Sequence, residues 1–193
     1  MMLMDEKVNL NIVNDLNSLE KKCMETFIPD EGERVVFGEG PANAKFMLIG
    51  EAPGAHEAKI GRAFIGNAGK ILNRYLEESD IHRELAYITN VVKVRPPGNR
   101  TPKKSEVNES LPFLQRQIEL IKPQVVVCLG RIAVQAIINP KAKITEIRGV
   151  WQQIKNIQIM PTYHPSVVFH DEIKKELLKK DLFEVGKILK KLL

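Results

Sequence analysis

Hydrophobic residues follow two patterns along this chain, continuous apolar runs and stripes at helical spacing. The continuous runs predict buried β-strands at residues 35–37, 45–49, 85–89, 125–129 and 157–160. The stripes predict helices over residues 12–27, 67–78 and 107–121, a further helix after Gly130, and a closing helix over 173–192. A hairpin is expected around Gly149.

Strands that alternate with helices and are apolar throughout are typical of a parallel sheet covered on both faces. We therefore predict a single α/β domain over residues 1–193, a three-layer α/β/α sandwich with a central, mainly parallel four-stranded sheet. Ligands of such sheets bind at the carboxyl ends of the strands. Three polar residues follow predicted strands there, Glu51, Asn90 and His164, so their side chains are expected to meet in one cleft.

The composition is that of an ordinary globular protein and excludes disordered and fibrous classes. Of the 193 residues, 44% are hydrophobic and 27% are charged, which is enough apolar material for a core. No apolar run approaches the roughly 20 residues of a membrane span, and the first residues lack the features of a secretory signal. The two cysteines cannot form a disulfide framework, which indicates a reducing compartment. We expect a cytoplasmic monomer with no membrane partner.

Positive charge is concentrated in one segment. The chain has 29 Lys and Arg against 24 Asp and Glu, a net charge of +5. The segment from Val91 to Ser105 alone contains five basic residues and no acidic one: Lys93, Arg95, Arg100, Lys103 and Lys104. Charge alone leaves two interpretations open, a solvated loop or a surface that contacts phosphates.

Short motifs narrow the class of ligand. The phosphate-binding patterns GxxxxGK[ST] and GxGxxG do not occur, and neither do HExxH or paired CxxC patterns, so no metal site is predicted. The motifs that do occur are, in order, Gly50-Glu-Ala-Pro-Gly54, Gly61-Arg-Ala-Phe-Ile-Gly66 with Ala68-Gly69, Thr89-Asn-Val-Val-Lys93, Arg95-Pro-Pro-Gly-Asn-Arg-Thr-Pro102, Leu129-Gly130 and His164-Pro-Ser166. This ordered set resembles the uracil-DNA glycosylase superfamily, and specifically its iron–sulfur branch, family four.

The resemblance implies a pocket for a base that has been extruded from DNA. In it, Phe64 would stack on the base and Asn90 would read uracil, because one primary amide complements both O4 and N3–H. His164 would stabilise the negative charge that develops on uracil O2. The other three histidines have no matching context and are expected at the surface: His56, His82 and His170.

Two carboxylates lie near this predicted pocket, Glu51 and Glu57. Either one could position the attacking water, stabilise the oxocarbenium-like sugar or shape the pocket around the base, and either could be a solvated loop residue. The resemblance also implies that Ala52 and Pro53 contact the base, together with Glu51.

The DNA backbone would be held by the basic loop and by the segment after His164. The predicted contacts are Lys93, Asn99, Arg100, Ser166 and Val167. Val167, Val168 and Phe169 could wedge into the vacated base stack, although packing into the core before the last helix explains these apolar residues equally well.

The iron–sulfur branch binds a [4Fe–4S] cluster through four cysteines, and here the resemblance is incomplete. Its ligand positions fall on Cys23, Thr26, Val94 and Ser110, while Cys128 lies in a predicted core strand. Because such clusters are held by thiolates, we predict that the cluster, and any other cofactor, is absent.

The resemblance therefore predicts a repair enzyme that hydrolyses the N-glycosidic bond of uracil in single- or double-stranded DNA and leaves an abasic site. Two alternatives remain at this stage. One is a superfamily member that removes another base, such as hypoxanthine or mismatched thymine, and the other is a catalytically silent DNA-binding module.

Overall fold

A computed structural model describes residues 2–192, and it describes the surroundings of side chains from residue 9 onward. Five strands form one sheet: β1 (Phe46–Gly50), β2 (Ala86–Asn90), β3 (Val125–Leu129), β4 (Gln152–Ile154) and β5 (Ile157–Thr162). The helices are α1 (Met2–Thr26), α2 (Ala55–Ile60), α3 (Asn67–Glu78), α4 (Lys104–Ile121), α5 (Arg131–Ile137), α6 (Ile144–Ile147) and α7 (Glu172–Leu192). Short 3₁₀ turns are η1 (Arg83–Leu85), η2 (Pro97–Asn99) and η3 (Pro165–Phe169).

The sheet has the strand order β2-β1-β3-β5-β4, in which the first four strands are parallel and β4 is antiparallel to β5. The mainly parallel α/β sheet is confirmed, but it contains five strands rather than four. The extra strand β4 is short and at the edge, and it is only partly buried, so its sequence lacks the apolar run that marks a core strand.

Two local expectations are wrong. Residues 35–37 are buried but form no strand, because their backbone makes one backbone bond among the described residues, Val36 N–H to Lys93 O (2.8 Å), to the segment that follows β2. The hairpin turns between β4 and β5 rather than at Gly149, which instead takes a positive φ of 71° ahead of β4.

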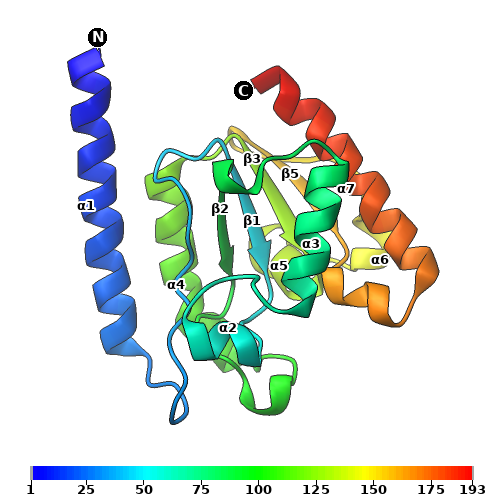
Figure 1. Cartoon of the computed structure of the whole chain (residues 1–193), viewed down its shortest axis with the longest axis horizontal. Helices are drawn as coiled ribbons and strands as arrows, with labels where there is room; N and C mark the ends of the chain where they lie inside the picture. Colours follow the sequence, from blue (N-terminus) through cyan, green and yellow to red (C-terminus); the bar gives the residue numbers. More distant parts are fainter. Residues whose placement is uncertain (1, 193) are drawn as a thin grey trace.

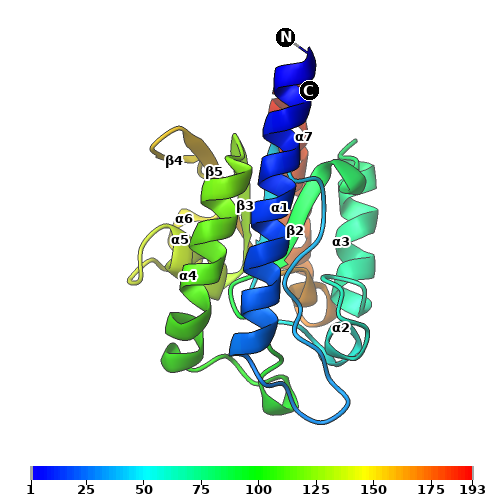
Figure 2. The same ribbon diagram turned by 90° about the vertical axis from the view of Figure 1, so that its left-hand side faces the viewer.

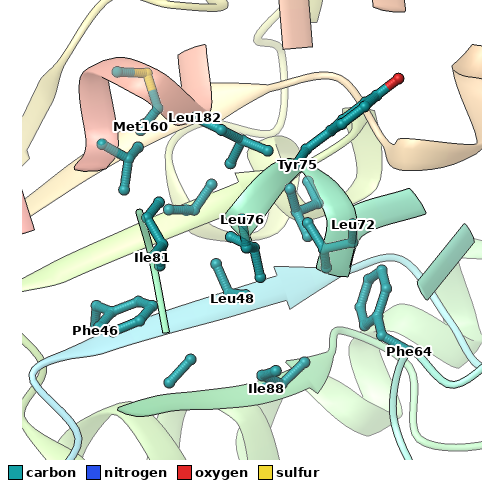
Figure 3. Packing of buried hydrophobic residues seen from close by; sticks show 14 of the residues in the cluster. Phe46, Leu48, Phe64, Leu72, Tyr75, Leu76, Ile81, Ile88, Met160 and Leu182 are labelled. Atoms are coloured by element: carbon teal, nitrogen blue, oxygen red, sulfur yellow. The ribbon is translucent and has the colours of Figure 1, made fainter. Parts of the chain in front are cut away.

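Helices cover both faces of the sheet, which confirms the three layers (Figures 1 and 2). One core is formed by strand residues such as Leu48 and Ile88 against Leu72 and Leu76 of α3 and Leu182 of α7 (Figure 3). The core on the opposite face packs the strands against α4, α5 and α6, and α1 lies along α4. None of the described helices is long and apolar enough to cross a membrane.

Candidate functional site

A cleft of about 700 Å³ opens at the carboxyl ends of the parallel strands. Glu51 follows β1, Asn90 ends β2 and His164 follows β5, and all three line this cleft. The expectation that strand-end residues meet is thus confirmed. Their convergence follows from the parallel register, which places Gly50 opposite Asn90 on neighbouring strands.

Asn90 contributes an unpartnered polar atom to the cleft. Its side chain is only 2% exposed, and its Oδ1 is buried without a hydrogen-bond partner among the described residues. A Cβ added at Gly50 would lie 2.4 Å from both Asn90 Oδ1 and Phe64 Cζ, so the absence of a side chain at Gly50 lets the amide and the ring approach each other. Buried polar groups almost always have partners, so this oxygen has an open hydrogen-bonding position for a water molecule or a ligand.

Phe64 forms the apolar part of the same site. Its ring is 5% exposed and lies 5.7 Å from the imidazole of His164, centroid to centroid. Figure 3 shows it beyond the carboxyl end of the strand that carries Leu48. Its backbone has φ of 53°, a conformation that bulky residues rarely adopt. Gly69 of α3 packs so closely that an added Cβ would lie 1.9 Å from Phe64 O.

Ser166 determines the tautomer of His164, and burial determines its charge. The backbone N–H of Ser166 donates to His164 Nδ1 at 3.2 Å, and Ser166 Oγ lies 2.9 Å from the same nitrogen. Burial lowers the pKa of His164 to about 4, although the carboxylate of Glu57 acts in the opposite direction. The imidazole is therefore neutral near pH 7, and because Nδ1 accepts a hydrogen bond, its proton is assigned to Nε2.

The two carboxylates differ in their surroundings. Glu57 of α2 is buried, and its Oε1 accepts a hydrogen bond from Gly66 N–H at 2.8 Å, just before α3 begins. Glu51 is half-buried, and burial raises its pKa while the positive charge of Arg131 lowers it. Both line the cleft, as do Ala52 and Pro53.

One predicted phosphate contact is wrong. Lys93 has no exposed surface, and its Nζ lies within hydrogen-bond distance of four internal acceptors: Thr89 Oγ1 (2.7 Å), Asn90 O (2.8 Å), Gln117 Oε1 (2.7 Å) and Phe37 O (3.2 Å). A lysine nitrogen that is enclosed by internal acceptors cannot reach a phosphate outside the protein, and burial lowers the pKa of Lys93 to about 7. Lys93 instead joins the end of β2 to α4.

Of the other four residues predicted to contact the DNA backbone, three line the cleft and one does not. Asn99, Arg100 and Ser166 line the cleft. Arg100 forms a two-pronged ion pair with Glu106, with N···O distances of 2.9 and 2.6 Å. Val167 is half-buried and lies outside the residues that line the cleft.

The two apolar residues after Val167 differ in burial. Val168 packs against the core, while Phe169 is 50% exposed. Core packing therefore explains Val168, and Phe169 is available for contacts outside the protein.

Sequence reasoning missed three polar side chains at the cleft. Asn67 and Lys70 of the first turn of α3 line it, and so does His56, which is exposed as expected of a surface residue. None of the three has a local sequence signal, because their position depends on how α2 and α3 fold over the strand ends.

A second cavity of about 410 Å³ lies beside the first, and Pro96 lines both. Three of the four positions that the resemblance assigns to cluster ligands line this second cavity, Thr26, Val94 and Ser110. The fourth, Cys23, is fully buried in an apolar cluster and is not among the lining residues.

The side chains at the second cavity do not fit a cluster. Thr26 Oγ1 donates to Lys22 O at 2.7 Å, Ser110 Oγ accepts from Lys93 N–H, and Val94 has no ligating atom. Within the described residues, no group of three or more His, Cys, Asp or Glu side chains could hold a metal ion.

Comparison with known proteins shows the family of the chain. The family model of the uracil DNA glycosylase superfamily matches residues 37–185, and the chain belongs to this superfamily. It is 36% identical to a type-4 uracil-DNA glycosylase of Sulfurisphaera tokodaii over 188 residues, which covers 90% of this chain and 86% of that protein. A protein of the same name from Thermotoga maritima is 39% identical over 178 residues, 89% of this chain and 91% of its own.

Proposed function

We propose that this chain is a monofunctional glycosylase that removes uracil from DNA by hydrolysis. Its membership of the superfamily and its likeness to type-4 enzymes support the reaction class. The single observation that supports uracil as the base is the buried, unpartnered Oδ1 of Asn90 beside the ring of Phe64.

Base recognition would combine stacking with amide pairing. A nucleotide must leave the helix to reach the cleft, which costs a few kcal/mol, and stacking on Phe64 returns about 1–3 kcal/mol. Asn90 Oδ1 would accept from N3–H of uracil while its amide N–H donates to O4. Cytosine has the opposite donor and acceptor pattern at these two atoms, so it would leave the buried amide unpaired, which costs about 1–3 kcal/mol.

The reaction breaks the bond between C1′ of deoxyribose and N1 of uracil, and the bonding electron pair leaves with the base. Water adds its oxygen to C1′, and the proton released balances the charge of the departing base. His164 Nε2–H would donate to uracil O2 as negative charge develops there. A neutral imidazole suffices for this role, which agrees with the lowered pKa of His164.

The two carboxylates would have separate roles. Glu57 would hold the Phe64 loop in place, because its Oε1 is already bonded to Gly66 N–H. Glu51 makes no such bond to the loop and lines the cleft, so we assign it to the attacking water and to the positive charge that develops on the sugar.

Phosphates on either side of the extruded nucleotide would contact the rim of the cleft, at Asn99, Arg100 and Ser166. Lys70 adds a further exposed cation to the same rim. Phe169 has the exposure that a wedge in the vacated base stack requires.

We further infer that the chain works without an iron–sulfur cluster. The thiolate ligands of such a cluster would have to come from Cys23, Thr26, Val94 and Ser110. Of these side chains, those of Thr26 and Ser110 supply hydroxyls and that of Val94 supplies only hydrocarbon. The donor set of the second cavity thus differs from that of the branch it resembles.

The test is excision from oligonucleotides that differ in one base. Purified protein is incubated with single- and double-stranded DNA that contains uracil, thymine, cytosine or hypoxanthine at one position, and abasic sites are cleaved with alkali. We expect cleavage of the uracil strands alone. Cleavage only at hypoxanthine or mismatched thymine would indicate another base preference, and binding without cleavage would indicate a silent DNA-binding module.

A further inference from the structure

Phe64 has a strained backbone, and the strain must be held by its surroundings. A non-glycine residue with a positive φ persists only where neighbouring groups determine its conformation. On one side the helix α3 does this, because Gly69 lets it pack directly on the backbone of Phe64. Glu57 bonds the end of the Phe64 loop at Gly66 N–H, and the guanidinium of Arg83 in η1 bonds the Phe64 carbonyl itself.

Arg83 joins three parts of the molecule. Its Nη2 donates to Ala63 O at 2.8 Å and its Nη1 to Phe64 O at 3.3 Å, so it bridges two successive carbonyls of the strained loop. Nη1 also donates to Asn73 Oδ1 of α3 at 2.7 Å, and Nη2 lies 3.3 Å from Glu39 Oε1. The side chain is 21% exposed. Only a planar group with several N–H donors can make these bonds at the same time, so a lysine at this position could not reproduce them.

We propose that Arg83 is a positioning residue for uracil excision that acts through Phe64. It holds the loop so that the ring faces His164 and the amide of Asn90, without touching the base itself. This inference rests on the proposed function, since it assigns to Arg83 the placement of the face on which uracil stacks. Displacement of a positioned group by about 1 Å can reduce a rate by about a hundredfold.

Arg62 provides a matched control. Its guanidinium binds the same carboxylate, with Nε 2.8 Å from Glu39 Oε2 and Nη2 3.2 Å from Oε1, but it is 61% exposed and makes no bond to Ala63 O or Phe64 O. Arg62→Met and Arg83→Met remove the same charge next to Glu39. Only Arg83→Met removes the bridge to the loop.

The first measurement is hydrogen–deuterium exchange at the amides of residues 64–66, which lie beyond the Arg62 control, and it requires no activity. We expect Arg83→Met to speed exchange of these amides and Arg62→Met to leave it unchanged. Equal exchange in the parent and in Arg83→Met would overturn the proposal. If the parent fails to excise uracil, the proposed function fails, while this measurement still decides whether Arg83 holds the loop.

The second measurement is a double-mutant cycle on the single-turnover excision rate. Arg83→Met should reduce the maximal rate by about ten- to a hundredfold in the parent, Arg83→Lys should restore only part of it, and Arg62→Met should change it less than about twofold. In the background of Phe64→Leu, Arg83→Met should add less than about twofold. Equal losses in both backgrounds, or an equal loss in Arg62→Met, would overturn the proposal.

Discussion

The two neighbouring cavities are both lined by Pro96, but they differ in the hydrogen bonding of Asn90 in one and of Thr26 and Ser110 in the other. In the larger cleft, Asn90 Oδ1 is buried and lacks a partner among the described residues. In the smaller cavity, the hydroxyls of Thr26 and Ser110 are bonded to backbone groups of Lys22 and Lys93. Within the described residues, the Asn90 oxygen is thus left open to an external partner, whereas the hydroxyls of Thr26 and Ser110 are satisfied internally.

The backbone shape of a site can therefore persist while the chemical groups that line it change. The fold still brings Thr26, Val94 and Ser110 together around one cavity, so the backbone arrangement does not require thiolates at these positions. The cleft depends on particular atoms, because a hydrogen bond to a buried base can be made only by the correct donor or acceptor.

The largest expected effect is at His164. Loss of a positioned donor to developing negative charge costs about 2.7–4 kcal/mol, so His164→Ala should reduce the single-turnover rate on uracil DNA by about 10²- to 10³-fold. Ser166→Ala is the control, because it removes the hydroxyl but retains the backbone N–H that donates to His164 Nδ1. Its loss should be smaller. Equal losses in the two variants would show that the imidazole acts only through its contact with the Ser166 hydroxyl.

The protonation of His164 gives the next prediction. Its pKa is about 4 in the folded protein against 6.5 ordinarily, so between these values the unfolded chain binds more protons than the folded one. Stability from this group is therefore full above about pH 6.5 and is lost as the pH falls through about 4. Titration of the imidazole by NMR should show a midpoint near pH 4. A midpoint near 6.5 would contradict the lowered pKa of His164.

A smaller effect is expected at the rim of the cleft. Arg100→Gln should weaken binding to DNA of any sequence and flatten the log–log salt dependence by about 0.9 for duplex DNA, the value for one phosphate. Lys104→Gln serves as the control because Lys104 carries the same charge, is exposed and does not line the cleft. The same flattening in both variants would mean that the loop acts only through its general charge.

The smallest effect on activity is expected at the second cavity. Anaerobically purified protein should be colourless and contain no stoichiometric iron or sulfide. Ser110→Ala should change the excision rate less than twofold but reduce stability by about 1 kcal/mol, because Lys93 N–H loses its acceptor. Stoichiometric iron with matching sulfide would remove the contrast between the two cavities.

The sequence predicted the parts of the fold that depend on local pattern. Apolar runs marked the four parallel strands, and because such strands end at one edge, Glu51, Asn90 and His164 could be expected in one cleft. The edge strand β4 was missed because its residues are polar and partly exposed.

Other features depend on contacts between distant segments. Lys93 belongs to a basic loop by sequence, yet acceptors from Phe37, Thr89, Asn90 and Gln117 surround its ammonium. Nothing near Lys93 in the sequence indicates that these groups will meet. The link from Arg83 to the loop of Phe64 spans about twenty residues and is equally invisible in the local pattern.

The central claim is that the amide of Asn90 selects uracil, and a change of that amide tests it most directly. Single-turnover excision is measured for Asn90→Asp and Asn90→Ala on oligonucleotides that contain uracil or cytosine, with folding checked by circular dichroism. Asn90→Asp replaces the donor to O4 with an acceptor, so uracil excision should fall by about 10²-fold or more and weak cytosine excision should arise. Asn90→Ala should lose uracil excision without any gain on cytosine. If both folded variants excise uracil at the parental rate, Asn90 does not read the base and the cleft is not the uracil site.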